Sequence, residues 1–362
     1  MPHRPILIMA GGTGGHVYPA LAVADYLYEK GIPLFWLGTS RGLEARIVPA
    51  RGYTLLTMNI SGLRGKGILR WLLAPYALLA ATIKAMGIIR RIKPAAVLGM
   101  GGFVSGPGGI AAWCLRIPLC IHEQNAICGL TNRILARLAD RVIAAFPGAF
   151  PDSVQATVTG NPVRTGIREI AQPEKRFSER PADELRILVL GGSQGARTLN
   201  RVVAETLAGM PPSMKLQIHH QAGDRFYAEA ADRYADVSHH VMLEPFIEDM
   251  AAAYAWADLV ICRAGALTIA ELTMAGVAAI LVPFPYAVDD HQTANARFMV
   301  NADAAICIQE RQLESKSLQA LLIGFYQDRP RLQAMAGKAR SLARPDATRD
   351  VAAICLEVAY GG

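Results

Sequence analysis

The residues near the N-terminus that are best suited to chemistry are the four glycines and the histidine of the stretch 11–16, Gly-Gly-Thr-Gly-Gly-His. Residues 6–10 before them are continuously apolar, which is typical of a strand buried on both faces of a parallel sheet. The glycines allow a tight turn that exposes backbone N–H groups at the start of a helix, which we expect over about residues 17–30. The sequence therefore predicts an anion site, with His16 at its mouth as a candidate general base.

The same pattern returns far down the chain. The apolar residues 186–190 run into Gly-Gly-Ser-Gln-Gly at 191–195, and a third glycine-rich stretch, residues 101–109, follows the apolar run 95–100. A single glycine after a strand is usually turn punctuation. Three such stretches at the ends of strands favour a bound ligand that carries phosphate.

Two common nucleotide-binding motifs do not fit the sequence. A dinucleotide fingerprint needs an acidic residue at the end of the second strand to hold the ribose, and this chain has Gly38-Thr-Ser-Arg41 there. No stretch matches the Gly-x-x-x-x-Gly-Lys-Ser/Thr loop of nucleoside triphosphatases. These departures argue against NAD and ATP chemistry.

A serine hydrolase is the alternative from another functional class. Residues 191–195 match the Gly-x-Ser-x-Gly element of α/β hydrolases, with Ser193 as nucleophile and Asp258 and His291 downstream as possible partners. This interpretation gives no role to His16 or to the N-terminal half. A serine after a glycine pair can equally bind phosphate at a helix start.

A carboxylate in the C-terminal half is a candidate ribose ligand. Glu271 ends the stretch 263–271, which carries a glycine turn and the hydroxyl of Thr268. The carboxylate can accept hydrogen bonds from both hydroxyls of a ribose. Thr268 and Glu271 also have the spacing of a capping box, which would make both residues structural. The polar cluster 289–292 can similarly bind a ligand or cap the next helix.

The elements that must position these residues alternate between apolar strands and helices, which predicts α/β domains with parallel sheets flanked by helices. Residues 141–145 are expected to close the first sheet, the polar segment 169–184 to be a linker, and the last helix, 347–360, to pack back on the first domain. Strands are expected near residues 6–10, 34–38, 53–58, 95–100, 118–122, 141–145, 186–190, 215–220, 240–243, 258–262, 278–282 and 304–308.

The 362 residues are enough for two domains. Residues 1–163 carry 16 Lys and Arg against 6 Asp and Glu, and no acidic residue lies between Glu44 and Glu123, so the first half should attract phosphates. No interleaving of aromatic and basic residues supports nucleic-acid binding. The six cysteines and the histidines lack metal-ligand spacing, and we expect reduced thiols, no catalytic metal and no secretion signal.

Six motifs in order give the chain a resemblance to the MurG family of UDP-N-acetylglucosamine transferases, which complete the lipid-linked precursor of peptidoglycan. The resemblance covers essentially the full chain. The motifs are Gly11-Gly-Thr-Gly-Gly-His16, Gly99-Met-Gly-Gly-Phe-Val-Ser-Gly-Pro-Gly-Gly109, His122-Glu-Gln-Asn125, Gly160-Asn-Pro-Val-Arg164, Gly191-Gly-Ser-Gln-Gly-Ala196 and Ala266-Leu-Thr-Ile-Ala-Glu271.

The resemblance implies a GT-B glycosyltransferase fold, with two Rossmann-like domains and a cleft between them. Residues 1–163 with 345–362 would bind the lipid acceptor, and residues 164–344 would bind the sugar donor. Ser193 and Arg164 would contact the diphosphate, Ile247 the uracil and Glu271 the ribose. The implied UDP-N-acetylglucosamine ligands are Thr13, Gly14, Gly15, Asn125, Arg164, Ser193, Ile247, Ala266, Leu267, Thr268, Ile269, Ala270, Glu271 and Gln292.

The implied reaction is an inverting transfer of N-acetylglucosamine to the 4-hydroxyl of the muramyl sugar of lipid I, without a cofactor. His16 is expected to take the hydroxyl proton. Residues 59–93 carry seven basic and no acidic residues around an apolar run, 71–83, that is too short to span a bilayer. This stretch predicts an interfacial anchor on anionic lipid at the cytoplasmic face of the inner membrane, although a core helix with a solvated basic face has the same pattern.

Overall fold

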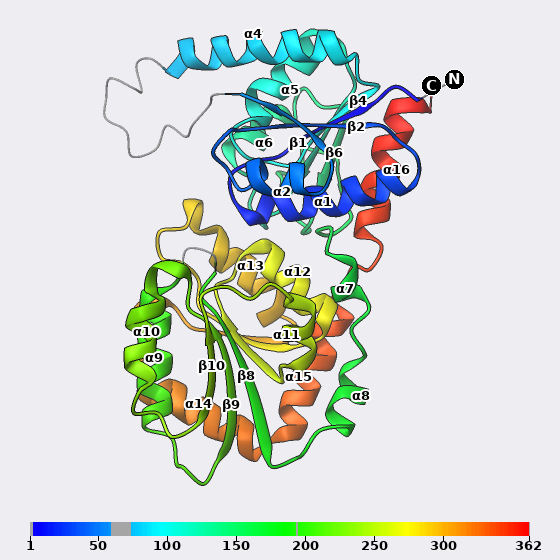
Figure 1. Ribbon diagram of the computed structural model, residues 1–362. Coiled ribbons are helices and arrows are strands. Elements are labelled where there is room, and N and C mark those ends of the chain that lie inside the picture. Colours follow the sequence, from blue (N-terminus) through cyan, green and yellow to red (C-terminus); the bar gives the residue numbers. More distant parts are fainter. Residues whose placement is uncertain (1–2, 59–73, 193–194, 362) are drawn as a thin grey trace. The chain divides into compact units, whose positions relative to one another are not determined.

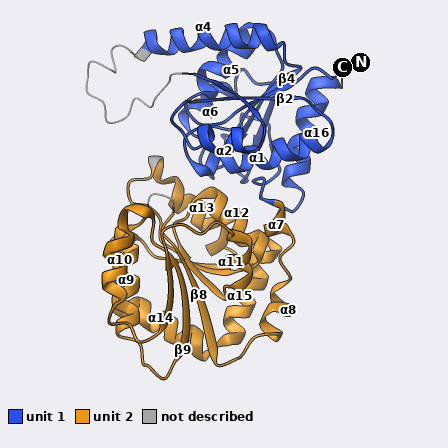
Figure 2. Ribbon diagram, viewed as in Figure 1, with its two compact units in different colours: residues 1–164, 344–362 blue, residues 165–343 orange. Residues whose placement is uncertain are grey.

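The computed structural model describes residues 3–58, 74–192 and 195–361. The chain divides into two compact units (Figure 2). Unit 1 comprises residues 1–164 and 344–362, and unit 2 comprises residues 165–343. The expected boundaries lay after residues 163 and 344, and the observed ones lie after residues 164 and 343, so Arg164 and Arg344 both belong to unit 1.

Unit 1 is built on a seven-stranded parallel sheet in the order β3-β2-β1-β4-β5-β6-β7, with helices against it (Figure 1). The order reverses between β1 and β4, which is the position where open α/β sheets bind ligands beyond the carboxyl ends of their strands. The elements are β1 (Ile6–Met9), α1 (Gly14–Glu29), β2 (Leu34–Gly38), α2 (Glu44–Ala50), β3 (Thr54–Thr57), α4 (Ala74–Ile92), β4 (Ala96–Gly99), α5 (Ser105–Cys114), β5 (Leu119–Glu123), α6 (Leu130–Leu135), β6 (Arg141–Ala144), β7 (Ala156–Val158) and α16 (Ala347–Tyr360).

The last helix returns to unit 1, as the sequence predicts. Val351, Ala352 and Cys355 of α16 are fully buried in the core that α1 forms with the strands β1 and β4. The strands are apolar on both faces because helices cover both sides of the sheet. The C-terminal helix therefore completes a hydrophobic layer that residues 1–164 leave open.

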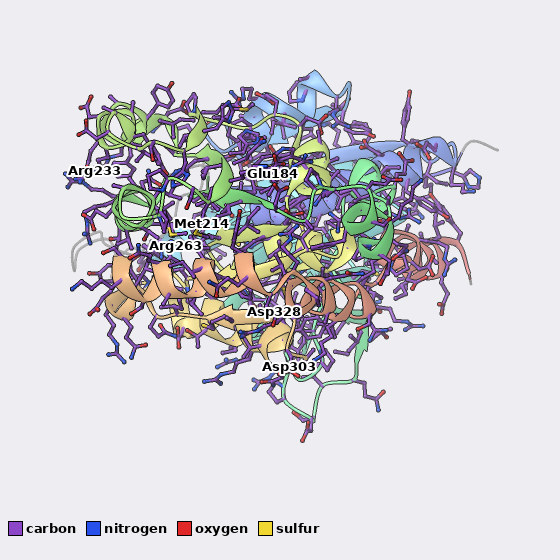
Figure 3. The ribbon with its side chains drawn as sticks, turned by 90° about the horizontal axis from the view of Figure 1, so that it is seen from below. Glu184, Met214, Arg233, Arg263, Asp303 and Asp328 are labelled. Carbon is purple, nitrogen blue, oxygen red and sulfur yellow. The ribbon has the colours of Figure 1, made fainter. Side chains whose placement is uncertain are left out.

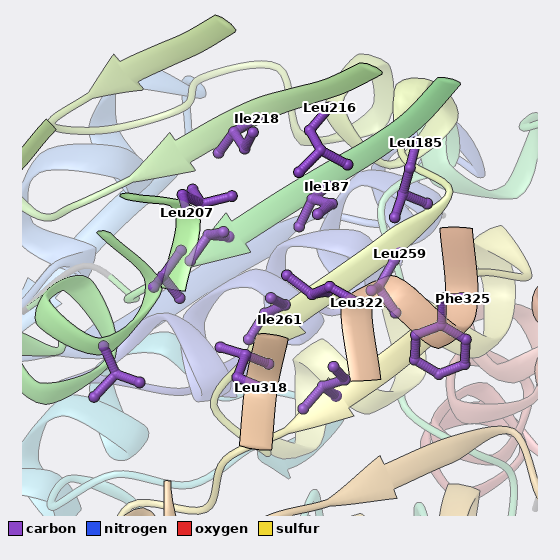
Figure 4. Packing of buried hydrophobic residues seen from close by; sticks show 14 of the residues in the cluster. Leu185, Ile187, Leu207, Leu216, Ile218, Leu259, Ile261, Leu318, Leu322 and Phe325 are labelled. Carbon is purple, nitrogen blue, oxygen red and sulfur yellow. The ribbon is translucent and has the colours of Figure 1, made fainter. Parts of the chain in front are cut away.

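Unit 2 repeats the architecture with a six-stranded parallel sheet in the order β10-β9-β8-β11-β12-β13. Leu185, Ile187 and Leu259 from its strands pack against Leu322 and Phe325 of α14 (Figure 4). The elements are α7 (Thr165–Arg168), α8 (Pro173–Ser178), β8 (Glu184–Leu190), α9 (Arg197–Ala208), β9 (Lys215–Gln221), α10 (Tyr227–Tyr234), β10 (His240–Glu244), α11 (Met250–Trp256), β11 (Leu259–Cys262), α12 (Ala266–Ala275), β12 (Ala278–Leu281), α13 (His291–Val300), β13 (Ala305–Cys307), α14 (Ser315–Gln327) and α15 (Arg329–Ser341).

Helices α14 and α15 follow one another with a single residue between them. Asp328 occupies that position (Figure 3). Its side chain accepts a hydrogen bond from the backbone N–H of Arg331 at 3.0 Å. This side-chain cap satisfies one of the N–H groups that a helix start leaves without an acceptor in the helix.

Two expectations about the organisation of the chain are wrong. Strand β6 does not close the first sheet, because β7 pairs with it in parallel. The segment 169–184 is not a free linker, because it contains α8, whose Arg176 is buried in unit 2. The Arg176 guanidinium donates hydrogen bonds to the backbone oxygens of Tyr254 (3.1 Å) and Ala275 (2.8 Å). This charged side chain of the segment therefore forms contacts inside unit 2 instead of facing solvent.

Candidate active site

The two glycine-rich stretches of unit 1 lie side by side beyond the neighbouring strands β1 and β4. The N–H of Met100 donates to the backbone oxygen of Met9 at 2.8 Å. The buried hydroxyl of Ser105 donates to the backbone oxygen of Gly101 at 2.8 Å and lies 3.3 Å from the oxygen of Met9. These bonds hold the two loops together at the position where the strand order reverses.

The loop after β1 runs directly into helix α1. The helix begins at Gly14, three residues earlier than the sequence indicates, and Thr13 is its N-cap residue. The backbone oxygen of Thr13 accepts from the N–H groups of His16 (3.1 Å) and Val17 (3.2 Å). The first N–H groups of a helix have no acceptor within it, so Gly14 and Gly15 stand where an anion can be bound.

The half-buried imidazole of His16 packs against the loop after β4. Gly101 has φ +98°, and a Cβ built on it would lie 2.5 Å from Cδ2 of His16. Only glycine combines this backbone conformation with this close approach. The second loop therefore sets the position of the ring that the sequence singles out as the general base.

Strand β5 delivers the carboxylate of Glu123 to the same edge of the sheet. Its Oε1 accepts from the backbone N–H (3.0 Å) and side-chain amide (3.1 Å) of Asn125, and its Oε2 accepts from the side-chain amide of Asn132 (2.8 Å) and the N–H of Gly129 (3.1 Å). Glu123 thereby fixes the turn that presents Asn125. Asn125, one of the predicted sugar ligands, therefore lies at the same edge of the sheet as the glycine loop that precedes His16.

His122 connects β5 to the segment that leaves unit 1. Its Nε2 faces the backbone oxygen of Gly160 at 3.0 Å, and its Nδ1 lies 3.1 Å from the side-chain amide of Gln124. A carbonyl oxygen only accepts, so Nε2 carries the proton and Nδ1 is the acceptor. Complete burial lowers the pKa of His122 to about 4, so the ring is neutral at physiological pH.

Arg164 ends unit 1 and its guanidinium lies 4.9 Å from the centre of the Tyr18 ring on α1. Such a cation–π contact restricts where the guanidinium points. Tyr18 also lies next to Gly14, where a built Cβ would come within 3.1 Å of the ring. Arg164 is thus held beside the first turn of α1.

In unit 2, the loop after β8 is held against β9. The N–H of Gly191 donates to the backbone oxygen of Gln221 at 3.0 Å. Ser193, the predicted diphosphate ligand and hydrolase nucleophile, lies outside the described residues. The loop ends where α9 begins at Arg197, which agrees with the predicted strand, glycine turn and helix.

Glu271 is buried on the α12 helix and accepts a hydrogen bond from the hydroxyl of Tyr254 at 3.1 Å. The helix begins at Ala266 with Gly265 as its N-cap residue, and the N–H of Ile269 donates to the oxygen of Gly265. The capping-box alternative is therefore wrong, because it requires Thr268 to be the N-cap. Glu271 lies in the second turn of the helix, where a carboxylate has no capping role.

The remaining residues of the expected ligand set in unit 2 lie on α12 and on two other segments. Ala266, Leu267, Thr268, Ile269 and Ala270 occupy the first five positions of α12.

Buried Ile247 follows β10, and its N–H donates to the side-chain oxygen of Gln221 at 3.1 Å. Gln292 is the second residue of α13, and its side-chain oxygen accepts from the N–H of Phe284 at 2.9 Å. Because Gln221 also accepts from Gly191 through its backbone oxygen, it links the segment of Ile247 to the glycine loop after β8.

The described residues do not support the hydrolase alternative. Asp258 precedes β11 and is buried in ion pairs with Arg180 and Arg329, and its Oδ2 accepts from the N–H of Arg186. The loop at 191–195 follows the carboxyl end of β8, which runs parallel to β11. A strand of this length separates its two ends by roughly 13 Å, so the carboxylate lies at the opposite end of the strands from Gly191, which follows β8.

The described ranges, 3–58, 74–192 and 195–361, contain no group of three or more His, Cys, Asp or Glu side chains placed to hold a metal ion. None of the helices within the same ranges has both the length and the apolar character that crossing a bilayer requires.

Sequence reasoning overlooked several residues that position the site. Ser105, Asn132 and Gln221 each hold a loop through side-chain bonds, and their types are too common in turns to stand out. Glu44 gave a signal, because it is the last acidic residue before a long stretch that contains none.

Comparison with known proteins identifies the class. The glycosyltransferase family 28 N-terminal domain matches residues 6–144, and the glycosyltransferase family 28 C-terminal domain matches residues 186–351. Two parallel-sheet units of seven and six strands, each with a glycine loop after its first strand, are the GT-B fold that the sequence predicted. The fold and the two matched domains are those of a glycosyltransferase.

Full-length relatives narrow the family. A protein of Alkalilimnicola ehrlichii is 54% identical and one of Nitrosococcus oceani 52% identical, and each alignment covers 98% of this chain and 99% of the relative. Both are named UDP-N-acetylglucosamine--N-acetylmuramyl-(pentapeptide) pyrophosphoryl-undecaprenol N-acetylglucosamine transferase. The crystal structure of Acinetobacter baumannii MurG is 42% identical with a TM-score of 0.85, covering 98% of this chain and 99% of that one. The chain belongs to the MurG family.

Proposed function

We propose that the protein transfers N-acetylglucosamine from UDP-N-acetylglucosamine to the 4-hydroxyl of the muramyl sugar of lipid I, producing lipid II for peptidoglycan. The observation that carries this proposal is 54% identity over 98% of the chain to a relative whose name gives the same sugar donor and the same lipid-linked acceptor. The glycine loops at the carboxyl ends of strands suit a donor that carries a diphosphate.

The proposal assigns the uracil and ribose of the donor to unit 2. Ile247 would contact the uracil, and Glu271 would accept hydrogen bonds from the ribose hydroxyls. The burial of Glu271 and its bond from Tyr254 support this role, because they fix the direction of the carboxylate that would accept from the ribose. Gln292 and Asn125 would contact the sugar.

The proposal assigns the diphosphate of the donor to a guanidinium and to backbone N–H groups at the start of a helix. Arg164, whose direction is restricted by Tyr18, and Ser193 at the glycine loop before α9 are the proposed contacts. Negative charge that develops on the departing diphosphate is stabilised by N–H groups at a helix start and by a guanidinium. This arrangement would supply the charge stabilisation that a metal ion provides in other transferases.

The chemical step forms a bond between the acceptor's O4 and C1 of the donor sugar, while the bond from C1 to the diphosphate oxygen breaks and UDP leaves. A single displacement inverts the configuration at C1. Neutral His16 takes the proton of the attacking hydroxyl, and Thr13, Gly14 and Gly15 approach the donor from the start of α1. The contact between His16 and Gly101 supports this role, because it holds the ring beside the loop.

The decisive experiment is transfer of labelled N-acetylglucosamine to a short-chain lipid I analogue, with and without chelator. We expect metal-tolerant transfer, and we expect His16→Ala to lose most of kcat while UDP binding is retained. His240→Ala in unit 2 is a matched control, because that exposed histidine has no proposed role. Absence of transfer by the wild type refutes the proposed activity, and an unchanged kcat in His16→Ala removes His16 from the chemistry.

We also propose that unit 1 binds the anionic cytoplasmic face of the inner membrane through α4 and its neighbours. Tyr76, Leu79 and Ile83 on α4 are 72%, 58% and 60% exposed, and Lys84 follows them. Trp113 on α5 and Ile134 on α6 are also more than half exposed. Large apolar side chains with adjacent lysine and arginine suit the headgroup region of an anionic bilayer.

Vesicle flotation tests the membrane proposal. The wild type should float with vesicles that contain phosphatidylglycerol and remain behind with neutral vesicles. Leu79→Ser with Ile83→Ser should abolish flotation, whereas Met242→Ser, an exposed apolar position in unit 2, should leave it unchanged. Flotation that does not depend on anionic lipid, or that survives the α4 substitutions, refutes this surface. The basic residues Lys66 and Arg70 lie outside the described residues.

A further inference from the structure

A fully buried carboxylate lies next to the loop that carries Thr13 and leads into His16. Glu44 is the first residue of α2 and has no exposed surface. Its Oε2 accepts a hydrogen bond from the N–H of Gly12 at 2.9 Å. Its Oε1 accepts from the N–H (2.8 Å) and the hydroxyl (2.7 Å) of Thr39. One carboxylate thus joins the loop after β1 to the loop after β2.

Three glycines form the space that the carboxylate occupies. A Cβ built on Gly11 would lie 2.6 Å from Oε1 of Glu44, one on Gly38 would lie 2.6 Å from Cγ, and one on Gly42 would lie 2.1 Å from Oε2. Non-bonded contacts this short are essentially never made by a Cβ atom, so any larger residue at these positions would displace the carboxylate. The glycines of both loops are therefore matched to Glu44.

The hydrogen bond from Gly12 constrains the residues that come directly after it in the chain. Gly12 has φ +94°, Thr13 is the N-cap of α1, and His16 lies in the first turn. A charge-assisted hydrogen bond at Gly12 is stronger than a neutral one and holds the loop in one conformation. Displacement of a catalytic group by about 1 Å can cost about a hundredfold in rate.

We propose that Glu44 is a positioning residue for the transfer reaction, which fixes the loop 11–15 and so the direction of the first turn of α1. The inference rests on the proposed function of His16 and Thr13. Glu44 itself has no contact with the substrate in this proposal, because it is fully buried. Its effect on the reaction is transmitted through the N–H of Gly12.

Glu44→Gln tests the proposal with little change in volume. The amide keeps one acceptor oxygen, so its NH2 group must face either the N–H of Gly12 or the two donors of Thr39. We expect kcat for the lipid I analogue to fall about 10- to 100-fold. The dissociation constant for UDP should change much less than kcat, because the proposed uracil, ribose and Ser193 contacts lie in unit 2.

Gly42→Ala provides an independent perturbation that keeps the carboxylate and removes no charge. It should lower kcat by a similar factor, and the double variant should be no worse than the poorer single variant, because both substitutions break the same contact. Asp25→Asn is the matched control. That carboxylate also binds two partners in unit 1, Arg51 and Tyr53, but it lies away from the glycine loop.

Hydrogen exchange separates positioning from a general loss of stability. In Glu44→Gln, a peptide covering residues 10–17 should exchange faster, while peptides from β4 and β5 should keep wild-type protection. Unchanged kcat in folded Glu44→Gln and Gly42→Ala overturns the inference, as does faster exchange throughout unit 1 with a proportionate loss of UDP-binding sites. Failure of the wild type to transfer sugar refutes the proposed function instead, and leaves the exchange measurement as the test of the contact.

Discussion

Protonation of His122 should destabilise unit 1 as the pH falls. The ring is completely buried, and burial lowers its pKa from 6.5 to about 4. Between these values the unfolded chain binds a proton at His122 that the folded chain does not, so stability falls as the pH decreases. For these two pKa values, the loss between pH 7.5 and pH 4.5 is about 2.5 kcal/mol.

The bonding of the ring explains why the protonated form is unfavourable. Nδ1 faces the amide of Gln124 and Nε2 donates to Gly160. A proton on Nδ1 would set two donors against each other and place a charge in the core. The hydrogen bond from Gln124 to Nδ1 would be lost, whereas Nε2 would still donate to Gly160.

Urea denaturation at several pH values measures this loss. Trp36, Trp71 and Trp113 belong to unit 1 and Trp256 to unit 2, so fluorescence in a Trp256→Phe background reports unit 1 alone. His122→Asn should be less stable than its parent at neutral pH, but its unfolding free energy should fall by about 2.5 kcal/mol less on acidification. Equal pH dependence in both proteins, or a titration midpoint of His122 above pH 6 by NMR, would refute the reasoning.

Three further predictions test other contacts. Gly101→Ala places a Cβ at a position with φ +98°, where it would lie 2.5 Å from His16. We expect kcat to fall at least tenfold in steady-state kinetics, while calorimetry shows UDP affinity maintained. Tyr254→Phe removes the hydroxyl that donates to Glu271, and calorimetry should show UDP binding weakened severalfold, whereas equal affinity would contradict the positioning of that carboxylate. Arg176→Met removes the guanidinium that donates to the carbonyl oxygens of Tyr254 and Ala275. Urea denaturation followed by Trp256 fluorescence should show unit 2 destabilised by about 3 kcal/mol. A change below about 0.5 kcal/mol would mean that the buried bonds add little to stability.

Local patterns in the sequence were sufficient for much of the architecture. Continuous apolar runs such as residues 6–10 and 186–190 predicted buried parallel strands, and the glycines after them predicted tight turns before helices. The resemblance in six motifs predicted the family and the fold. The roles of His16 and Glu271 in the reaction remain proposals.

The errors arose where a segment's environment contradicted its composition. The charged segment 169–184 has the composition of a linker, yet the guanidinium of Arg176 donates hydrogen bonds to backbone carbonyl oxygens inside unit 2. The hydrolase alternative relied on chain order, which does not specify the edge of the sheet at which Asp258 lies. The capping-box alternative depended on the residue at which α12 begins, and helix starts are the least certain part of a sequence-based assignment.

By itself, the sequence determined the repeated strand, glycine turn and helix, because these depend on residue types within a few positions of one another. Only the tertiary structure decided which distant residues share a contact. It brought Gly101 against His16, joined Glu44 to Gly12 across two loops and separated Asp258 from the glycine loop after β8. Such contacts follow from strand order and packing, which bring together residues far apart in the chain and are therefore not encoded in any local pattern.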